Sequence, residues 1–219
     1  MSKLKQKNEP WNLRTEHKRQ KGKIPYRKRY LICTEGKTEA LYFNHYKSST
    51  GPIIVPLDKS DHKVNLVKKT IKEKNIRIAN QEFDEAIDEA WVVLDRDADP
   101  INQLDKNYFN QTLEIAKEHK ISVAYSNDAF ELWVLLHYQD LKTSTHRDQL
   151  CKMLSKHIGV KYEKSNDLYQ KIKDSRLTAL KRASDLLKLH SKKPESANHS
   201  TTIHLLVNKL LNEPGYREE

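Results

Sequence analysis

Short apolar runs alternate with amphipathic segments over the first two thirds of the chain. The apolar runs have the length of strands and predict strands at 30–34, 53–57, 91–94 and 121–125. Elsewhere, apolar residues recur at helical spacing and predict helices at 38–47, 62–80, 101–119 and 130–138. This alternation is typical of βαβ units, so we expect an α/β fold with a mostly parallel sheet of about four strands flanked by helices.

The pattern changes after residue 140, where no further strand is predicted. Amphipathic segments predict helices at 147–157, 168–190 and 202–211. Before the first strand the chain is polar and basic, which is typical either of a loosely ordered tail or of an arm that contacts nucleic acid. We therefore expect three parts: a basic N-terminal arm at 1–28, an α/β domain at 29–140 and a helical extension at 141–219 packed on it.

The chain of 219 residues has a formal net charge of +10 and a sequence pI near 9.4. This balance favours nucleic acid as a partner, because Lys and Arg displace counterions from phosphates, although a solvated basic surface gives the same charge. Cys33 and Cys151 form neither a disulfide framework nor a paired zinc spacing, which fits a reducing cytoplasm. No apolar run reaches the length of a membrane span and no signal-peptide core is visible, so we expect a cytoplasmic protein without membrane contact.

Acidic residues follow two of the predicted strands at the point where each strand ends. Glu35 and Gly36 come after the first strand, and Asp95 and Asp97 come after the third. Right-handed crossovers bring the carboxyl ends of parallel strands to one edge, and in extended geometry Asp95 and Asp97 leave the chain on the same side. Carboxylate oxygens suit Mg²⁺ or Mn²⁺, so we expect one shared metal site with Glu35 as a ligand or a general base. The alternative is that these acids only solvate turns or cap helices.

Lys37 and Arg96 flank these acids and are candidates for contact with a substrate phosphate, although a solvated lysine accounts for Lys37 equally well. The sequence Gly-Lys-Thr at 36–38 is similar to the end of a P-loop. That motif needs a glycine five positions earlier, where this chain has Leu31, so nucleotide binding through a P-loop is excluded. A phosphatase nucleophile pair at Asp95 and Asp97 is a weaker alternative, because it leaves Glu35 without a role.

The segment 126–137 carries polar residues within an otherwise apolar helix. Glu131 lies in its first turn and is either a further metal ligand or a partner of the helix dipole. His137, and His204 in the last predicted helix, are more typical of hydrogen-bonded packing histidines than of catalytic ones. Together with Asn127 they are accessory candidates only.

Four segments, at 31–43, 92–97, 126–137 and 200–207, resemble the RloB-like family, and the similarity extends over about 25–212. Its most specific parts are Glu-Gly-Lys-Thr-Glu at 35–39 and Asn-x-x-Phe-Glu-Leu-Trp at 127–133. The resemblance implies a Toprim-like, Rossmann-like α/β fold, in which a glutamate and an Asp-x-Asp pair match Glu35, Asp95 and Asp97. The family commonly has proline after the asparagine, whereas this chain has Asp128, which affects the expected turn but not the acids.

The resemblance also implies a function, because RloB-like proteins are found in restriction and abortive-infection loci. We expect a metal-dependent nuclease of bacterial antiphage defence, which cleaves RNA such as tRNA, or DNA. Other proteins of a defence locus are expected partners, and the formation of a homo-oligomer stays open. A non-catalytic nucleic-acid-binding or regulatory subunit and a small-molecule phosphotransferase are the alternatives.

Overall fold

The computed structural model describes residues 28–46, 53–56, 63–97, 103–141, 143–190 and 199–213. The predicted basic arm at 1–28 lies almost entirely outside these described residues. None of the helices in this part of the chain is both long and apolar enough to cross a membrane.

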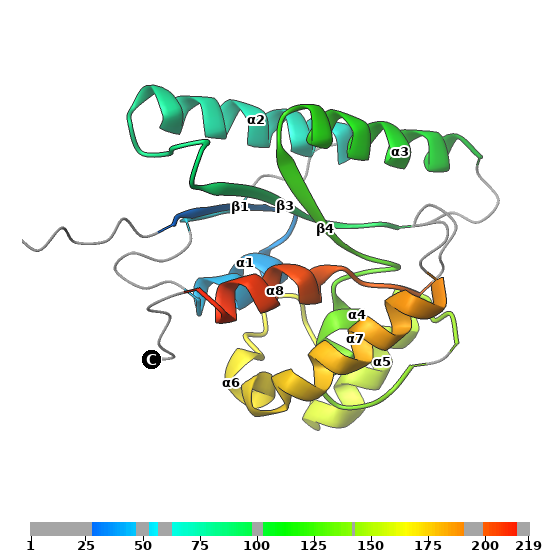
Figure 1. The fold of residues 1–219 in the computed structure, drawn as a ribbon. Helices are drawn as coiled ribbons and strands as arrows, with labels where there is room; N and C mark the ends of the chain where they lie inside the picture. The colour runs from blue at the N-terminus through cyan, green and yellow to red at the C-terminus, as the bar shows by residue number, and fades with distance from the viewer. Residues whose placement is uncertain are drawn as a thin grey trace, which may run out of the picture.

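A four-stranded sheet forms the centre of the fold, and all of its neighbouring strands run parallel (Figure 1). Its order is β2-β1-β3-β4, and its strands are β1 (Tyr30–Thr34), β2 (Ile53–Pro56), β3 (Glu89–Asp95) and β4 (Ile121–Ser126). The inner strands β1 and β3 are almost wholly buried, as their continuous apolar runs predict for strands covered on both faces. The prediction of a mostly parallel α/β sheet of about four strands is therefore confirmed.

One face of the sheet is covered by α2 (Lys63–Ala79) and α3 (Gln103–Glu118), which lie above it in Figure 1. Leu66 and Val67 of α2 are buried there, while Lys68, Lys69 and Lys72 of the same helix face solvent. The apolar stripe and these exposed lysines fix which side of α2 packs on the sheet.

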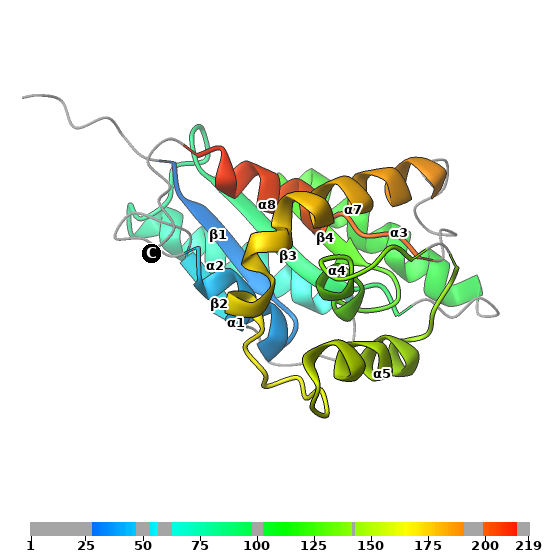
Figure 2. The ribbon, with the colours of Figure 1, turned by 90° about the horizontal axis from the view of Figure 1, so that it is seen from below.

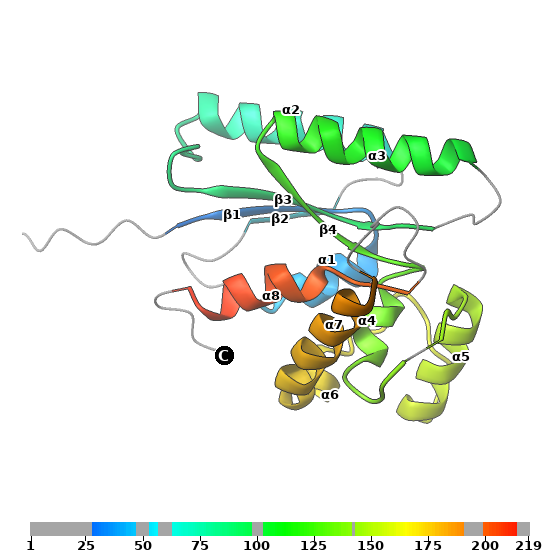
Figure 3. The same cartoon turned by 45° about the vertical axis from the view of Figure 1, so that its right-hand side comes forward.

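The other face carries the first and the last helix of the α/β part and the helices of the extension (Figures 1 and 3). Next to the sheet lie α1 (Lys37–Asn44) and α8 (Ile203–Leu211), and α4 (Glu131–Leu135), α5 (Arg147–Ile158), α6 (Tyr169–Ile172) and α7 (Arg176–His190) follow. Figures 2 and 3 show α5 at the outer side of this layer. A single hydrophobic cluster combines residues of β1 and β3 with residues of α4 to α8. The extension thus shares a core with the sheet.

The segment before α8 is tied to the end of β4. Thr202 N–H donates to Tyr125 O at 2.8 Å, Asn127 N–H donates to Ser200 O at 2.8 Å, and Ser126 forms an isolated antiparallel bridge with Thr201. These bonds bring residues about 75 positions apart in the sequence to the carboxyl edge of the sheet.

Two predicted helices differ from the structure. The segment 168–190 is not one helix, because the 3-10 turn Lys173–Ser175 separates α6 from α7. Asp and Ser favour local backbone bonds over helix, which explains a break at this polar stretch. The segment 130–138 is helical only from Glu131 to Leu135. At its start, Phe130 makes no side-chain cap bond, and the Asp128 carboxylate accepts Arg147 N–H instead of capping this helix.

Candidate functional site

Glu35 and Asp95 meet at the carboxyl edge of the sheet. Glu35 directly follows β1, and its N–H donates to Val93 O at 3.1 Å, which continues the ladder between β1 and β3. Its carboxylate Oε2 accepts the main-chain N–H of Asp95 at 3.1 Å. The structure therefore brings together the two strand ends on which the sequence placed a shared site.

Asp95 is buried, with 7 % of its surface exposed. Its Oδ1 accepts Phe130 N–H at 2.8 Å, and its Oδ2 accepts Arg147 Nη2–H at 3.1 Å. Burial raises the pKa of Asp95 well above its ordinary value, and the carboxylates of Glu39 and Asp97 raise this pKa further. A carboxylate in this position favours a cation beside it.

Asp97 lies near Asp95, as expected, but with a different backbone conformation from the extended one that the sequence predicted. Its φ is 45°, which is the left-handed region, so the extended geometry predicted for Asp95 and Asp97 ends before Asp97. Its N–H donates to Asp128 O at 3.1 Å, and its carboxylate contacts the guanidinium of Arg147. The two aspartates are therefore joined through Arg147, with Lys63 Nζ 3.8 Å from Asp97 Oδ2 on another side.

Glu39 is a site residue that the sequence analysis did not assign. It lies in the first turn of α1 and is 5 % exposed. A Cβ on Gly36 would lie 2.5 Å from Glu39 Oε2, so the missing side chain of Gly36 makes room for this carboxylate. Burial raises the pKa of Glu39 to about 7, and the carboxylates of Glu131 and Glu35 contribute to this rise. The available signal was the second glutamate of Glu-Gly-Lys-Thr-Glu, which helical geometry turns back toward the strand end.

Glu131 completes the group from α4. It is 2 % exposed, and its Oε1 accepts a hydrogen bond from Tyr162 OH at 3.0 Å. Its charge contributes to the raised pKa values of both Asp95 and Glu39. Five carboxylates thus share one region, which we call the acidic cluster: Glu35, Glu39, Asp95, Asp97 and Glu131.

The helical extension supplies the opposite wall of the acidic cluster. Arg147 is the first residue of α5, Tyr162 lies in the loop after α5, and the Lys164 carbonyl accepts Thr38 Oγ1–H at 2.8 Å beside Glu39. The sequence analysis assigned no role to these residues, because only the tertiary packing of the extension on α1 and α4 brings them to the site.

The two basic residues that were predicted to contact a substrate phosphate differ in their exposure. Lys37 is exposed at the start of α1, where a substrate could reach it. Arg96 is 0 % exposed and its guanidinium lies 4.5 Å from the ring centre of Phe109, so the expected contact between Arg96 and a phosphate is contradicted. Successive residues at a strand end point to opposite faces, and Arg96 therefore turns away from Asp95.

Asn127, His137 and His204 belong to the packing of the fold. Asn127 is buried and its N–H bonds to Ser200 O. His137 Nδ1 lies 3.0 Å from Trp133 O, and burial lowers the pKa of His137 to about 4. His204 Nδ1 lies 3.0 Å from Thr201 O, and burial lowers its pKa as well. Both histidines are buried packing residues of the kind that the sequence favoured.

The chemistry of the acidic cluster fits a hard divalent cation, because its donors are oxygens and its crowded negative charges raise each other's pKa. Within the described ranges, however, no three His, Cys, Asp or Glu side chains are already arranged as a metal-binding group. The positive charge between Asp95 and Asp97 comes from Arg147.

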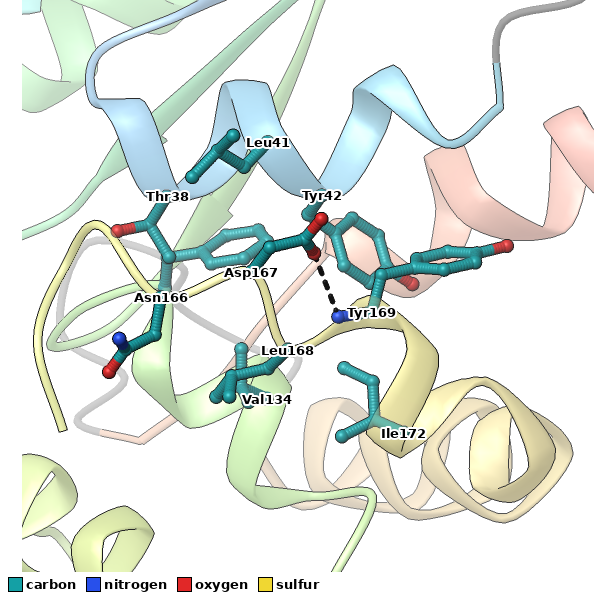
Figure 4. A pocket seen from close by; sticks show the side chains of 10 residues that line it. Thr38, Leu41, Tyr42, Val134, Asn166, Asp167, Leu168, Tyr169 and Ile172 are labelled. Atoms are coloured by element: carbon teal, nitrogen blue, oxygen red, sulfur yellow. Dashed lines mark hydrogen bonds between the residues drawn. The ribbon is translucent and has the colours of Figure 1, made fainter. Parts of the chain in front are cut away.

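A small cavity lies beside α1, between Tyr42, Val134 and the segment with Asp167 and Tyr169 that leads into α6 (Figure 4). Asp167 Oδ1 accepts Tyr169 N–H at 3.1 Å along its rim. The space that water can occupy is about 10 Å³, which is room for about one molecule. This cavity is therefore too small for a nucleotide.

Comparison with known proteins gives one result. A family model described as RloB-like protein matches residues 30–210, which is well over half of the chain and includes every member of the acidic cluster. Neither the curated proteins nor the solved structures give a match to this chain.

Proposed function

This chain belongs to the RloB-like family, and we propose that it is a metal-dependent nuclease that hydrolyses phosphodiester bonds of nucleic acid in bacterial antiphage defence. The observation that carries this proposal is the hydrogen bond between Asp95 N–H and Glu35 Oε2, which places acids from two strand ends in one buried group. Carboxylates crowded in this way are unfavourable unless a cation offsets them, so their presence supports a site for Mg²⁺ or Mn²⁺.

Asp95 and Asp97 would hold the ion, with Glu35 beside them. A bound divalent ion supplies Lewis acidity and lowers the pKa of water. The residues of the chain would do the rest. Burial raises the pKa of Glu35, which makes its carboxylate a better proton acceptor than an exposed glutamate, and it is the candidate general base. Glu131 is more buried, and its carboxylate accepts a hydrogen bond from Tyr162. It would not bind the ion directly but would add negative charge beside the ligands.

Basic side chains around the acidic cluster would hold the phosphates of the substrate. Lys37 is exposed beside Glu35, and Lys63 and Arg147 lie within 4 Å of Asp97. The net charge of +10 supports a polyanionic substrate. RNA and DNA both fit these contacts, and a cytoplasmic location and partner proteins of a defence locus remain predictions.

The experiment is a cleavage assay with the full-length protein, Mg²⁺ or Mn²⁺, and mixed DNA and RNA substrates that include tRNA. We expect cleavage by the wild type and its loss in Asp95→Asn. Expression of wild type and of Glu35→Ala in cells, followed by separate inspection of DNA and tRNA, would identify the substrate. Folded wild-type protein that binds neither Mn²⁺ nor Mg²⁺ and cleaves neither polymer would refute the proposal.

A non-catalytic nucleic-acid-binding or regulatory subunit is the second candidate. The observation in its favour is that the guanidinium of Arg147 already pairs with both Asp95 and Asp97, where the metal would bind. This alternative predicts salt-dependent binding of nucleic acid that is unchanged by divalent ions, without cleavage.

A further inference from the structure

The guanidinium of Arg147 lies between the two aspartates to which we assign the metal. Its Nη2 donates to Asp95 Oδ2 at 3.1 Å and also contacts Asp97 Oδ1. We propose that Arg147 is an internal competitor of the divalent cation: it pairs with both aspartates, and a cation binds there only after this side chain swings away. The inference rests on the proposed function, because it concerns the regulation of that site.

The two cations exclude one another for a simple reason. A divalent ion held by Asp95 and Asp97 would need carboxylate oxygens that now accept the guanidinium. Asp95 Oδ1 accepts Phe130 N–H, and the guanidinium contacts the other oxygen of this carboxylate, Oδ2. A guanidinium and a metal ion held side by side in a largely buried place would also repel each other.

The position of Arg147 allows its side chain to leave. The side chain is 32 % exposed, whereas that of Asp95 is only 10 % exposed. The main chain of Arg147 is fixed, since its N–H donates to Asp128 Oδ2 at 3.1 Å at the start of α5. A rotation of the side chain is therefore sufficient, and no helix has to move.

The released guanidinium would have two partners within reach. Its Nε already lies 4.0 Å from Asp128 Oδ2, which offers another carboxylate. A phosphate of the substrate offers the second, because guanidinium groups bind phosphate oxygens in paired hydrogen bonds. Binding of nucleic acid and binding of the ion would then favour one another. A substrate phosphate would draw Arg147 away from the aspartates, and the ion would bind where the guanidinium had been.

Lys63 provides a matched control for this idea. Its Nζ also lies beside Asp97, 3.8 Å from Oδ2, but Lys63 does not bridge Asp97 to Asp95 as Arg147 does. Replacement of Lys63 by Gln removes one positive charge from the same surroundings and leaves the bridge intact. A purely general effect of charge would make the two replacements equivalent.

The test is isothermal titration of the full-length protein with MnCl₂, for wild type, Arg147→Gln and Lys63→Gln. We expect Arg147→Gln to bind Mn²⁺ about tenfold more tightly than wild type and Lys63→Gln to differ from wild type by about twofold or less. Equal effects of both replacements, or an unchanged affinity in Arg147→Gln, would overturn the competitor role alone. Absence of Mn²⁺ binding in all three proteins would overturn this role together with the proposed function.

Arg147→Lys keeps the charge and the start of α5, and it serves if the Gln variant does not fold. An ammonium group cannot bridge two carboxylates with the geometry of a guanidinium, so we expect an Mn²⁺ affinity between those of wild type and Arg147→Gln. Thermal unfolding without metal checks that each variant is folded. An affinity in folded Arg147→Lys that equals or falls below that of wild type would overturn the competitor role.

Discussion

Asp95 N–H donates to Glu35 Oε2 at 3.1 Å, although the two residues are 60 positions apart in the sequence. This bond joins the residue after β1 to the last residue of β3, the strand that lies beside β1 in the sheet. The Glu35 carboxylate is thereby held on the side of the sheet edge where the Asp95 carboxylate meets Arg147. The fold itself, rather than a flexible loop, sets the distance between these two acids.

The first prediction concerns Asp95→Asn. Asn keeps an oxygen that can accept Phe130 N–H, and it removes one charge from a crowded buried group. We therefore expect an unfolding free energy equal to or above that of wild type in metal-free buffer, while cleavage falls by about 100-fold or more. Urea denaturation and the nuclease assay measure the two effects.

Asp185→Asn is the control for this replacement, because Asp185 is exposed on α7 and pairs with Lys188. It should change neither the unfolding free energy nor cleavage. An Asp95→Asn protein that cleaves at the rate of wild type would contradict a role for Asp95 in the reaction.

The sequence predicted the sheet and the meeting of Glu35 with Asp95 because both follow from local patterns. Apolar runs of strand length locate β1 and β3, and the rule for parallel strands puts their ends on one edge. Arg147 and Tyr162 could not be found in this way. They reach the acidic cluster only because the extension folds back onto α1 and α4, and such contacts between distant segments leave no periodic signal.

The predictions for Arg96 and Asp97 were wrong, and Glu39 was missed, for local reasons. Arg96 was expected at the site because it adjoins Asp95, but neighbouring residues in extended chain face opposite ways. Asp97 was expected in extended geometry, and its left-handed backbone shows that the strand has already ended. Glu39 was overlooked because its helix was interpreted by its apolar positions, although the glycine three residues earlier leaves space for this carboxylate at the strand end.

The second prediction concerns Gly36→Ala. The backbone of Gly36 has φ −128° and ψ 171°, which any residue can adopt, so the only obstacle to a Cβ is Glu39 Oε2 at 2.5 Å. We expect Gly36→Ala to lower the unfolding free energy by about 1 kcal/mol in wild type, because a buried carboxylate has to move. In a Glu39→Ala background the same replacement should cost nothing or stabilise slightly, since the space is then free.

Gly159→Ala is the matched control for this cycle. Gly159 ends α5 with φ 74°, and a Cβ there meets nothing within 4 Å. Its replacement should cost about 1 kcal/mol through backbone strain alone, whether or not Glu39 is present. If Gly36→Ala also costs the same in both backgrounds, the steric relation between Gly36 and Glu39 is wrong.

The third prediction concerns Tyr162→Phe. The Tyr162 hydroxyl donates to Glu131 Oε1 at 3.0 Å, and Glu131 is 2 % exposed. Phe leaves this carboxylate without that donor, so we expect a loss of about 1–2 kcal/mol in unfolding free energy at pH 8. Tyr138→Phe, whose ring stacks on His157, should have a much smaller effect.

A second comparison tests whether the hydroxyl stabilises the charge of Glu131. In a Glu131→Gln background the amide oxygen can still accept the hydrogen bond but carries no charge, so Tyr162→Phe should cost less than in wild type. Equal costs in the two backgrounds would show that the hydroxyl does not stabilise the charge of Glu131.

The last prediction concerns pH. The pKa of Glu39 rises from its ordinary 4.5 to about 7 in the folded protein. Between these values the folded state keeps a proton that the unfolded chain releases, so the unfolding free energy should fall as pH rises from about 4.5 to about 7. The raised pKa values of Asp95 and Glu35 act in the same direction. Urea denaturation at a series of pH values, in buffer with a chelator, measures this slope.

Glu39→Gln removes the group that titrates and keeps its shape. A rise of the pKa from 4.5 to about 7 corresponds to roughly 3 kcal/mol, which is the upper limit for the stabilisation of Glu39→Gln at pH 8 relative to wild type. Below about pH 4.5 the two proteins should be equally stable, because Glu39 is then protonated in both folded and unfolded wild type. Glu114→Gln, an exposed position on α3, should leave the pH profile of wild type unchanged. A profile of Glu39→Gln that runs parallel to that of wild type from pH 4.5 to 8 would show that the burial of this carboxylate does not govern stability.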